Sequence, residues 1–468
     1  MKHRHCISII IAFLLFQGCH KELGVPNHVF FIVIDALRAD HLGCYGYKVP
    51  TSPTIDRLAD EGIIFKNAYA TASNTLESVF SFFNSTTALT NNVHKFNAYE
   101  AKSLSATSLQ KYLTDAGYNT FAIVSNPWLK HHQDYFQDGF SHFHFVVTST
   151  SWKQKGISNT TDLVTQAVFD ILETKFDNNR NSFFYIHYLD PHMPYKPPVD
   201  YKFFNGDPNV GSFVKNGLAN VGEGAVREKY AKDPTYSGIA VPEPLSENDL
   251  KYLIAQYDGE IRYVDSQIEK LIAKLESMNI LDDSLIIITS DHGDEFFEHG
   301  CFHHGFQLYN ETIHIPLIFY WKDQLDDKTK KNIVSGIDIA PTILDFYRLE
   351  IPPSMLGSSL LRKKKDEPIL FCTHFINQKQ RGMRMGRWKL IENVHTGEIK
   401  IFDIKKDPGE QKNLFADALQ ERAHILQTYK NLLAHHSVKT DDTTDKKSKG
   451  PSGIDAETRQ QLEALGYL

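Results

Sequence analysis

Cysteine is scarce in this sequence, with five among 468 residues. Cys6 and Cys19 lie in the N-terminal segment, and the other three, Cys44, Cys301 and Cys372, are widely spaced. An odd, scattered set is not the disulfide framework of a small secreted domain. No two cysteines form a CxxC pair, so a structural zinc knuckle is not expected.

An excess of positive charge is also lacking. Lys and Arg number 50 against 57 Asp and Glu, which gives a net charge of -7 with histidine neutral. Because nucleic-acid-binding proteins usually carry a basic excess, we expect no nucleic acid as a partner. The 22 histidines are notable, since histidine is the commonest metal ligand, but their number alone assigns no site.

Long apolar runs are absent except near the N-terminus, where Ile7–Phe16 follows a positively charged start. That run has the length of a secretory signal core and is too short to cross a bilayer as a helix. Leu15–Cys19 resembles a bacterial lipoprotein cleavage box. We therefore expect residues 1–19 to be a signal peptide and the protein to be exported to the periplasm or cell envelope. Lipidation of Cys19, which would attach the protein to a membrane, and ordinary cleavage nearby both stay open.

What the sequence does contain is an alternation of strand and helix patterns. Continuous apolar runs typical of buried parallel strands occur at residues 28–34, 119–124, 182–189 and 284–289. From Leu250 to Leu275 apolar residues recur every three or four positions, which predicts an amphipathic helix capped by Ser246. This alternation predicts an α/β domain over residues 26–367, with a mostly parallel sheet flanked by helices.

The pattern changes from about residue 368. Short strand patterns occur at 369–373, 382–385, 388–392 and 399–402, and a helix pattern occupies about 415–434. They predict a small C-terminal α+β subdomain, 368–435, with an antiparallel sheet and one helix. Residues 436–468 are predicted to be a polar linker and tail. Residues 200–245, rich in Gly, Pro and Asn, predict a long surface loop of the kind that often lines a site.

Two aspartates follow strand patterns closely. Asp35 comes directly after the first run, and Asp291 comes just after the fourth, followed by His292 and Gly293. Ligands of open α/β sheets bind beyond the carboxyl ends of the strands, so both carboxylates can converge on one cation. Gly293 allows a sharp backbone turn there. For Asp35 alone, a helix cap or a turn former is an equally good interpretation.

Thr75 precedes a helical stretch that runs to about Phe83. The N–H groups and the dipole at a helix N-terminus favour negative charge. Coordination by a metal lowers the pKa of a hydroxyl, so Thr75 is a candidate nucleophile and metal ligand. A simple N-cap threonine fits the local sequence as well.

Four histidines are further candidates. His192 lies between two prolines in YLDPHMPYKPP, and His299, His303 and His304 lie in EHGCFHHG. Histidines in such irregular segments bind metals or anions, or donate protons. Surface histidines without a function are also common, so each of these assignments stays open.

Several motifs, in this order, resemble the sulfatase family of the alkaline phosphatase superfamily. They are IDALRADHLGCYGY (34–47), ITSDHGDEFFEHG (288–300), HHGFQLYNETIHIPLI (303–318), GIDIAPTILDF (336–346), GRWKLI (386–391) and FDIKKDPGEQKNL (402–414). The resemblance covers residues 28 to about 415. It implies the alkaline-phosphatase-like α/β fold, a divalent metal, and attack on a sulfate or phosphate ester.

The chain departs from the family at the nucleophile motif. Sulfatases carry Cys or Ser in C/S-x-P-x-R, which is oxidised to formylglycine, whereas the matching stretch here is Thr75–Val79 (TLESV). Threonine cannot become formylglycine, so none is expected. The family's frequent second aspartate is Ala36, and its lysine-containing loop reads Ser125-Asn126-Pro127. We assign substrate binding to Asn126 together with the histidines at positions 192, 299 and 304.

Carried onto this chain, the resemblance implies one divalent cation, with Asp35, Thr75, Asp291 and His292 as its ligands. Zn²⁺ or Mn²⁺ suits this mixed set at least as well as Ca²⁺, because imidazole is not a usual Ca²⁺ ligand. We expect a hydrolase in which metal-bound Thr75 attacks a sulfate, phosphate or phosphonate ester in line. The catalytic histidines would be His192 and His304, which bind anionic oxygens or protonate the leaving group. The substrate would be a small-molecule or glycan ester.

Two alternatives stay open. A transferase acting on envelope lipid or glycan would use the same covalent step with an alcohol acceptor. A catalytically inactive member would only bind an anionic glycan, and the departures at Ala36, Glu77 and Val79 fit that alternative. Metal content would separate an inactive member from an enzyme.

Overall fold

The computed structural model describes residues 23–91, 108–132, 136–146, 160–207, 209–211, 245–325, 328–362, 366–373, 380–417 and 420–436. The predicted signal peptide with Cys19, most of the predicted surface loop, and the tail beyond residue 436 lie outside these ranges. Within these ranges, no helix has the length and apolar character needed to cross a membrane.

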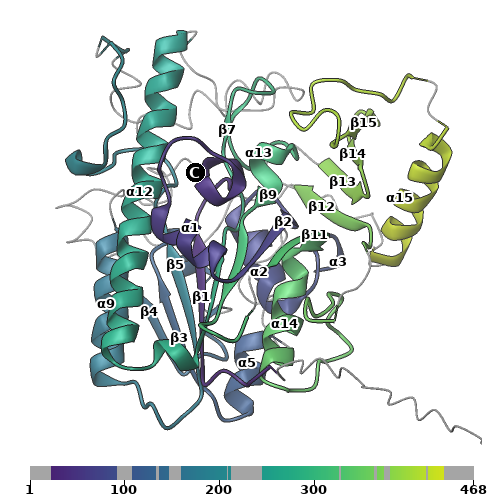
Figure 1. Cartoon of the computed structure of the whole chain (residues 1–468). Helices are drawn as coiled ribbons and strands as arrows, with labels where there is room; N and C mark the ends of the chain where they lie inside the picture. The colour runs from purple at the N-terminus through teal and green to yellow at the C-terminus, as the bar shows by residue number, and fades with distance from the viewer. Residues whose placement is uncertain are drawn as a thin grey trace, which may run out of the picture.

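A nine-stranded sheet forms the centre of the larger domain (Figure 1). Its strands are β1 (His28–Ile34), β2 (Ile63–Tyr69), β3 (Asn119–Val124), β4 (His142–Phe145), β5 (Ser182–Tyr188), β6 (Ser284–Thr289), β9 (His314–Ile315), β10 (Leu317–Tyr320) and β11 (Lys328–Ser335). The order is β11-β2-β10-β6-β1-β5-β3-β4, with β9 paired to β2. Only β9 and β10 run antiparallel to their neighbours among these strands, which confirms the predicted mostly parallel sheet.

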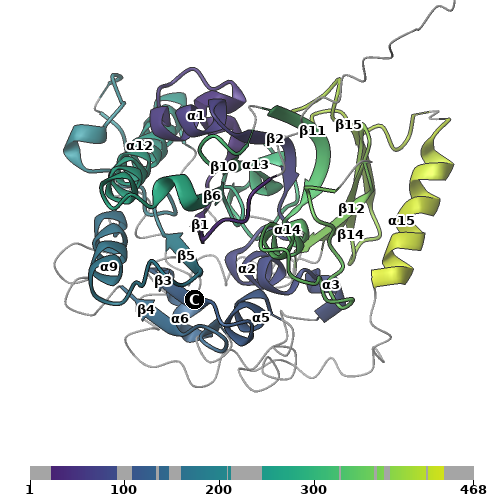
Figure 2. The ribbon, with the colours of Figure 1, turned by 60° about the horizontal axis from the view of Figure 1, so that its bottom comes forward.

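Helices cover both faces of this sheet (Figure 2). One face carries α1 (Pro53–Asp60), α9 (Thr161–Thr174) and α12 (Glu247–Ser277), and the other carries α2 (Thr75–Asn84), α5 (Leu109–Asp115) and α14 (Ile339–Phe346). Successive residues of a strand point to opposite faces, so β1 contributes to both cores. Phe30 and Ile32 pack with α9 and α12, whereas Phe31 and Val33 pack with α2 and α14. This burial on both sides explains why the strand is apolar throughout.

Shorter elements complete the larger domain. They are the helices α3 (Ala88–Asn91), α6 (Pro127–His131) and α13 (Asn310–Ile313), the strand pair β7 (Glu295–Phe296) and β8 (Phe302–His303), and 3-10 turns at Ala39–His41, Gly43–Tyr45, Val199–Tyr201, Leu281–Asp283 and Gly336–Asp338. The predicted cap of α12 is present, because the Ser246 hydroxyl accepts from the N–H of Asp249 at 3.1 Å.

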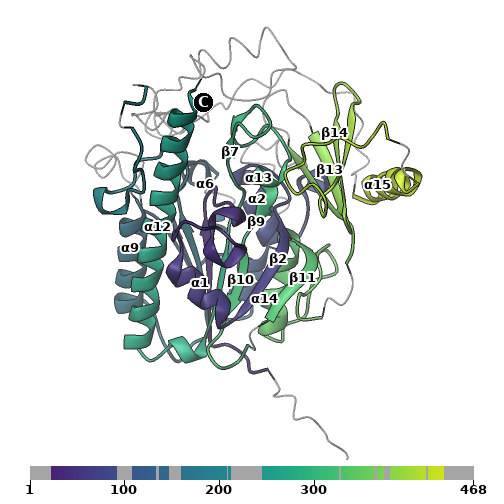
Figure 3. The same cartoon turned by 45° about the horizontal axis from the view of Figure 1, so that its top comes forward.

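The C-terminal subdomain is an antiparallel sheet with α15 (Arg422–His436) on its outer side (Figure 3). The strands are, in spatial order, β12 (Ile369–Thr373), β13 (Gln380–Met385), β14 (Trp388–Asn393) and β15 (Ile399–Asp403). Met383 and Leu390 face α15, whereas Phe371 and Ile391 join the core of the larger domain. The sheet is therefore sandwiched between the helix and the larger domain.

The predicted start of the last helix at about residue 415 is wrong, since α15 begins at Arg422. The side chain of Asn413 accepts the N–H of Phe415 at 3.0 Å, and Arg422 donates to the carbonyl of Phe415 at 2.8 Å. The side chain of Arg422 thus occupies a backbone carbonyl that a helix starting at residue 415 would use, and the segment forms turns instead.

Candidate active site

Asp35 and Asp291 meet at the carboxyl edge of the sheet because β1 and β6 are parallel neighbours. Both side chains are fully buried. Oδ1 of Asp291 accepts the N–H groups of Ala36 and His292 at 3.2 and 2.9 Å. Oδ2 of Asp291 and Oδ1 of Asp35 are buried with no hydrogen-bond partner in the described part of the chain. Two carboxylate oxygens without partners in a buried site need another group to neutralise them.

The second oxygen of Asp35 is held by the protein itself. Asn126 donates its side-chain amide to Oδ2 of Asp35 at 2.6 Å, and Nε2 of His187 lies 3.1 Å from the same atom. The hydroxyl of Tyr185 lies 2.7 Å from Nδ1 of His187. Tyr185 can donate there, which leaves the proton on Nε2 to be donated to Asp35. This chain of contacts fixes the orientation of the Asp35 carboxylate.

Thr75 is the first residue of α2, and it does not cap the helix. The cap is Asn74, whose side-chain oxygen accepts the N–H of Glu77 at 3.1 Å. The simple N-cap interpretation of Thr75 is therefore wrong. Its hydroxyl oxygen is buried and lies 3.2 Å from Nε2 of His292, at the helix end where the dipole favours negative charge.

Nε2 of His292 is the common neighbour of the predicted ligand atoms. It lies 3.2 Å from Oγ1 of Thr75, 3.6 Å from Oδ1 of Asp35 and 3.4 Å from Oδ2 of Asp291. The carboxylate oxygens in this set are the same two that lack partners. All four predicted metal-binding residues are thus brought together.

A divalent cation fits this group of atoms. Burial, and then the neighbouring carboxylate of Asp291, raise the pKa of Asp35 well above its usual value. A bound cation would offset the repulsion between the two buried carboxylates. Three oxygens with one imidazole nitrogen form a ligand set that Zn²⁺ and Mn²⁺ accept. Asp35, Asp291 and His187 also have ligand atoms within 4.8 Å of one another.

His187 is one of the site residues that the sequence analysis missed. It lies on β5 near the carboxyl end, directly beside β1, where Val33 is its register partner. The available signal was one polar residue inside the apolar run SFFYIHY. Burial lowers the pKa of His187 to about 4, so the ring is neutral near neutral pH.

Asn126 lies in the site, and both the nitrogen and the oxygen of its side-chain amide form hydrogen bonds. Its Nδ2 donates to Asp35, and its Oδ1 accepts the N–H of Trp128 at 2.8 Å as the cap of α6. These contacts make Asn126 a positioning residue for Asp35. Its predicted contact with substrate stays a prediction.

A second group of side chains, His192, His303, His304 and Asp294, lies next to the first. The rings of His304 and His292 are 3.9 Å apart between centroids. Oδ1 of Asp294 lies 2.6 Å from Nδ1 of His304 and 3.2 Å from Nδ1 of His303. Although burial alone would raise the pKa of Asp294, His304 and His303 hold it well below its usual value. Burial lowers the pKa of His192 to about 3.

His299 does not join either group through its contacts. Its ring stacks on Tyr309 with centroids 3.5 Å apart, and its Nε2 lies 3.3 Å from the carbonyl of Glu410. Phe297 and Gly300 have positive φ angles of 69° and 81°, so the chain turns tightly around this residue and directs it to the C-terminal subdomain. The structure thus gives no contact that supports substrate binding by His299.

Gly293 is required for a reason other than the one expected. Its φ is not positive, but a Cβ there would lie 2.1 Å from the carbonyl oxygen of Glu311 and 2.9 Å from Cγ of Arg38. The close approach of two neighbouring segments, and not a sharp turn, excludes a side chain directly after His292.

Comparisons with known proteins agree with this geometry. Residues 27–347 match the family model described as Sulfatase, and residues 297–439 match one described as N-sulphoglucosamine sulphohydrolase, C-terminal. The chain is 27% identical over 490 residues to an N-acetylglucosamine-6-O-sulfatase of Bacteroides thetaiotaomicron, with 85% of this chain and 84% of that protein covered.

Two solved structures show the same fold. One is described as in complex with its substrate D-glucosamine-2-N,6-O-disulfate, and matches with a TM-score of 0.70, 22% identity, and coverage of 88% of this chain and 98% of that one. The other is a phosphonate monoester hydrolase of Agrobacterium radiobacter, with a TM-score of 0.68, 19% identity, and coverage of 88% and 96%. Both confirm the predicted arrangement of a central sheet with a C-terminal subdomain.

Proposed function

The chain belongs to the sulfatase family, and from this starting point we propose that it hydrolyses an anionic ester by direct attack of the Thr75 hydroxyl. Members of this family are hydrolases that act on sulfuric esters. One observation carries the proposal: Nε2 of His292 lies within 3.6 Å of Oγ1 of Thr75, Oδ1 of Asp35 and Oδ2 of Asp291. Threonine therefore takes the place of the residue that the family oxidises to formylglycine.

One divalent cation would be held by Asp35, Asp291, His292 and Thr75. When bound, it supplies the positive charge that lowers the pKa of a hydroxyl and neutralises an anionic ester. The imidazole of His292 favours Zn²⁺ or Mn²⁺ over Ca²⁺.

The protein's own residues carry the reaction in two steps. Oγ1 of Thr75 forms a bond to phosphorus or sulfur while the bond to the leaving alcohol breaks in line. The Thr75 hydroxyl gives up its proton and the leaving alcohol oxygen takes up one, so the step is balanced in protons; the negative charge of the transferred group faces the positive end of the α2 dipole. Water then cleaves the threonine ester, which releases the inorganic or organic anion and restores the hydroxyl. In this scheme His192 and His304 line the ester side of the site.

The identity of the nucleophile favours phosphate and phosphonate esters over sulfates. A sulfate ester on formylglycine can break down by elimination, whereas a threonine sulfate lacks that route and would be slow to hydrolyse. The similar proteins include an N-acetylglucosamine-6-O-sulfatase and one in complex with its substrate D-glucosamine-2-N,6-O-disulfate, so a sugar that carries the anionic ester is the proposed substrate class. The N-terminal segment supports export to the cell envelope, with a lipid on Cys19 as the proposed anchor.

The test compares native protein with Thr75→Ala and Thr75→Ser on p-nitrophenyl sulfate, p-nitrophenyl phosphate, bis-p-nitrophenyl phosphate and p-nitrophenyl phenylphosphonate. We expect Thr75→Ala to lose at least about 1000-fold in kcat, because the nucleophile is removed. Thr75→Ser should keep measurable turnover. Acid quenching of native enzyme with its best substrate should trap a modified Thr75, detectable by peptide mass.

Thr174→Ala is the matched control, since Thr174 is exposed at the end of α9 and bonds only to the carbonyl of Asp170 among its described contacts. Equal activity of Thr75→Ala and native protein would overturn the proposal. A modified Thr75 that is released only when an alcohol is added would instead identify a transferase.

A further inference from the structure

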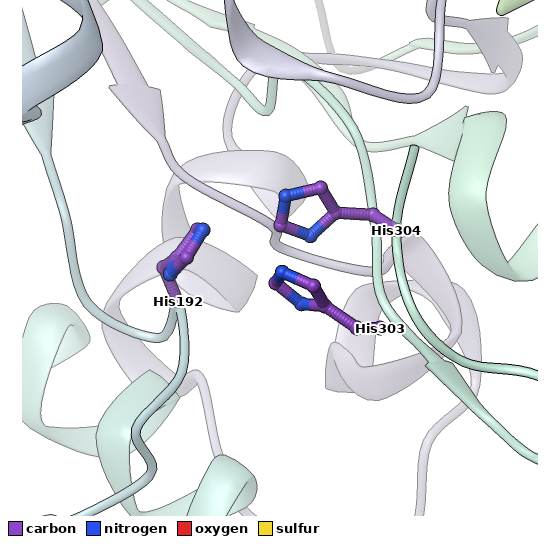
Figure 4. A group of neighbouring side chains, drawn as sticks. All are labelled: His192, His303 and His304. Carbon is purple, nitrogen blue, oxygen red and sulfur yellow. The ribbon is translucent and has the colours of Figure 1, made fainter. Parts of the chain in front are cut away.

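Three imidazoles from two separate segments converge beside the proposed hydrolytic site (Figure 4). His192 comes from the loop after β5, and His303 and His304 come from β8 and the residue that follows it. Each offers a ring nitrogen within 4.8 Å of the others, and all three are buried. Three buried imidazoles that converge form one of the ligand sets found at catalytic Zn²⁺ centres.

The neighbours of these rings select one tautomer. Nδ1 of His192 lies 2.7 Å from the carbonyl oxygen of Met193, and Nδ1 of His304 lies 2.6 Å from Oδ1 of Asp294. Nδ1 of His303 lies 3.2 Å from the same carboxylate oxygen. The hydrogen bonds of His192 and His304 place the proton of each ring on Nδ1, so these two neutral rings carry their lone pairs on Nε2, where a metal ion binds.

Asp294 is itself held in place, since the hydroxyl of Tyr195 donates to its Oδ2 at 2.7 Å. A buried carboxylate that orients ligating histidines through their second nitrogen is the common outer shell of metal centres. The two oxygens of Asp294 thus link the imidazoles to a rigid part of the molecule.

The backbone at His303 adds an independent observation. Its φ is 76°, a left-handed conformation that favours glycine. Backbone strain of this kind is concentrated at functional positions, where the surrounding structure stabilises the unfavourable conformation. Here it places a third imidazole against His304, with ring centroids 3.7 Å apart.

We propose that His192, His303 and His304 bind a second divalent cation, Zn²⁺, adjacent to the first. Three imidazoles favour Zn²⁺ over Ca²⁺ and Mg²⁺, which take oxygen ligands, and they leave a fourth position for an oxygen of the ester. The 3.9 Å between the rings of His304 and His292 makes the two centres neighbours. The inference rests on the proposed function, which assigns the ligands of the first cation. In this arrangement the three imidazoles bind the second cation, and the cation contacts the ester in their place.

The experiment measures Zn²⁺ per chain in full-length, tag-free protein that has been stripped with chelator, reloaded with Zn²⁺ and gel-filtered. Native protein should hold two equivalents, with two peaks in anomalous diffraction at the zinc edge. His303→Gly, which relieves the positive φ, and His304→Gln should each hold one. Asp291→Asn should also hold one, retained at the three histidines.

His395→Ala is the control, because His395 is exposed in the β14–β15 turn. Its Zn²⁺ content should equal that of native protein. One equivalent in native protein, kept in His303→Gly and lost in Asp291→Asn, would overturn this inference and leave the proposed function standing. One equivalent kept in Asp291→Asn and lost in His303→Gly would support the histidine centre and overturn the first. No bound Zn²⁺ in native protein would overturn both.

Discussion

Asn126 donates a 2.6 Å hydrogen bond to Oδ2 of Asp35, so the amide holds one carboxylate oxygen while the other faces His292. Replacing Asn126 with Ala should therefore loosen Asp35 without removing any predicted metal ligand. We expect a 10- to 100-fold loss of metal affinity, about the usual effect of removing such an outer contact. Competition with a chromogenic chelator measures it. Asn178→Ala, at an exposed asparagine that contacts His28, should bind metal as native protein does.

Variants of Tyr185 and His187 test how the contacts that orient the Asp35 carboxylate affect metal affinity. Tyr185→Phe removes the hydroxyl 2.7 Å from Nδ1 of His187, whereas His187→Phe removes the contact to Asp35 as well. Metal affinity should fall in the order native, Tyr185→Phe, His187→Phe, with the last about 100-fold weaker. A larger loss in Tyr185→Phe than in His187→Phe would contradict this chain of contacts.

Removal of metal should abolish turnover of the best chromogenic ester. Dialysis against chelator leaves the buried oxygens of Asp35 and Asp291 without a counter-charge, so activity is expected to fall at least about 100-fold. Addition of Zn²⁺ or Mn²⁺ should restore more activity than Ca²⁺, because His292 supplies an imidazole ligand. Full recovery with Ca²⁺ alone would show that His292 is not a ligand.

Glu295 should make stability depend on pH. Burial, and then the charge of Glu311, raise the pKa of Glu295 from 4.5 to about 8. Between these values the folded protein keeps a proton that the unfolded chain releases, so the free energy of unfolding falls as pH rises from about 4.5 to 8. Because one pKa unit corresponds to about 1.4 kcal/mol, a change from 4.5 to about 8 gives a loss on the order of 5 kcal/mol.

Glu295→Gln keeps the oxygen that accepts the N–H of His299 and removes the ionisation. Its urea-unfolding free energy should change less between pH 5 and pH 8 than that of native protein. Glu350→Gln, at an exposed position, should follow the native dependence. An unchanged slope in Glu295→Gln would show that the carboxyl titrates normally.

A buried ion pair within the C-terminal subdomain contacts the larger domain at Asn310. Nζ of Lys389 lies 2.7 Å from Oε1 of Glu410 and donates to Oδ1 of Asn310 at 3.0 Å. Lys389→Met leaves the Glu410 carboxylate buried without its cation, which should cost about 3–5 kcal/mol. Lys389→Met combined with Glu410→Gln should recover much of that loss, measured by thermal or urea unfolding. A double variant less stable than Lys389→Met would contradict the pairing.

The central fold could be predicted because burial on both faces makes a parallel strand apolar throughout. The runs that became β1, β3, β5 and β6 were recognisable for that reason. Parallel strands also present their carboxyl ends at one edge, which is why Asp35 and Asp291 could be predicted to meet. The start of α15 could not, since the side chain of Arg422 takes the carbonyl of Phe415 that an earlier helix start would use.

The candidate site was only partly predictable. Thr75 and Asn74 are both acceptable caps by sequence, and only the position of α2 shows that Asn74 takes that role. His187 appeared as one polar residue in a strand, because its contact with Asp35 depends on the register of β5 against β1. A contact between residues that are 152 positions apart, such as His187 and Asp35, cannot be recognised from the local sequence around either residue.

By itself, the sequence determined the family and led to the proposal of Thr75 as nucleophile, because a threonine at position 75 and ordered motifs are properties of residues and their spacing. The tertiary structure alone decided which imidazoles meet which carboxylates. His292 lies with Thr75, His303 and His304 lie against Asp294, and His299 turns away to Tyr309. Backbone turns between neighbouring residues direct these side chains, and spacing along the chain does not encode those directions.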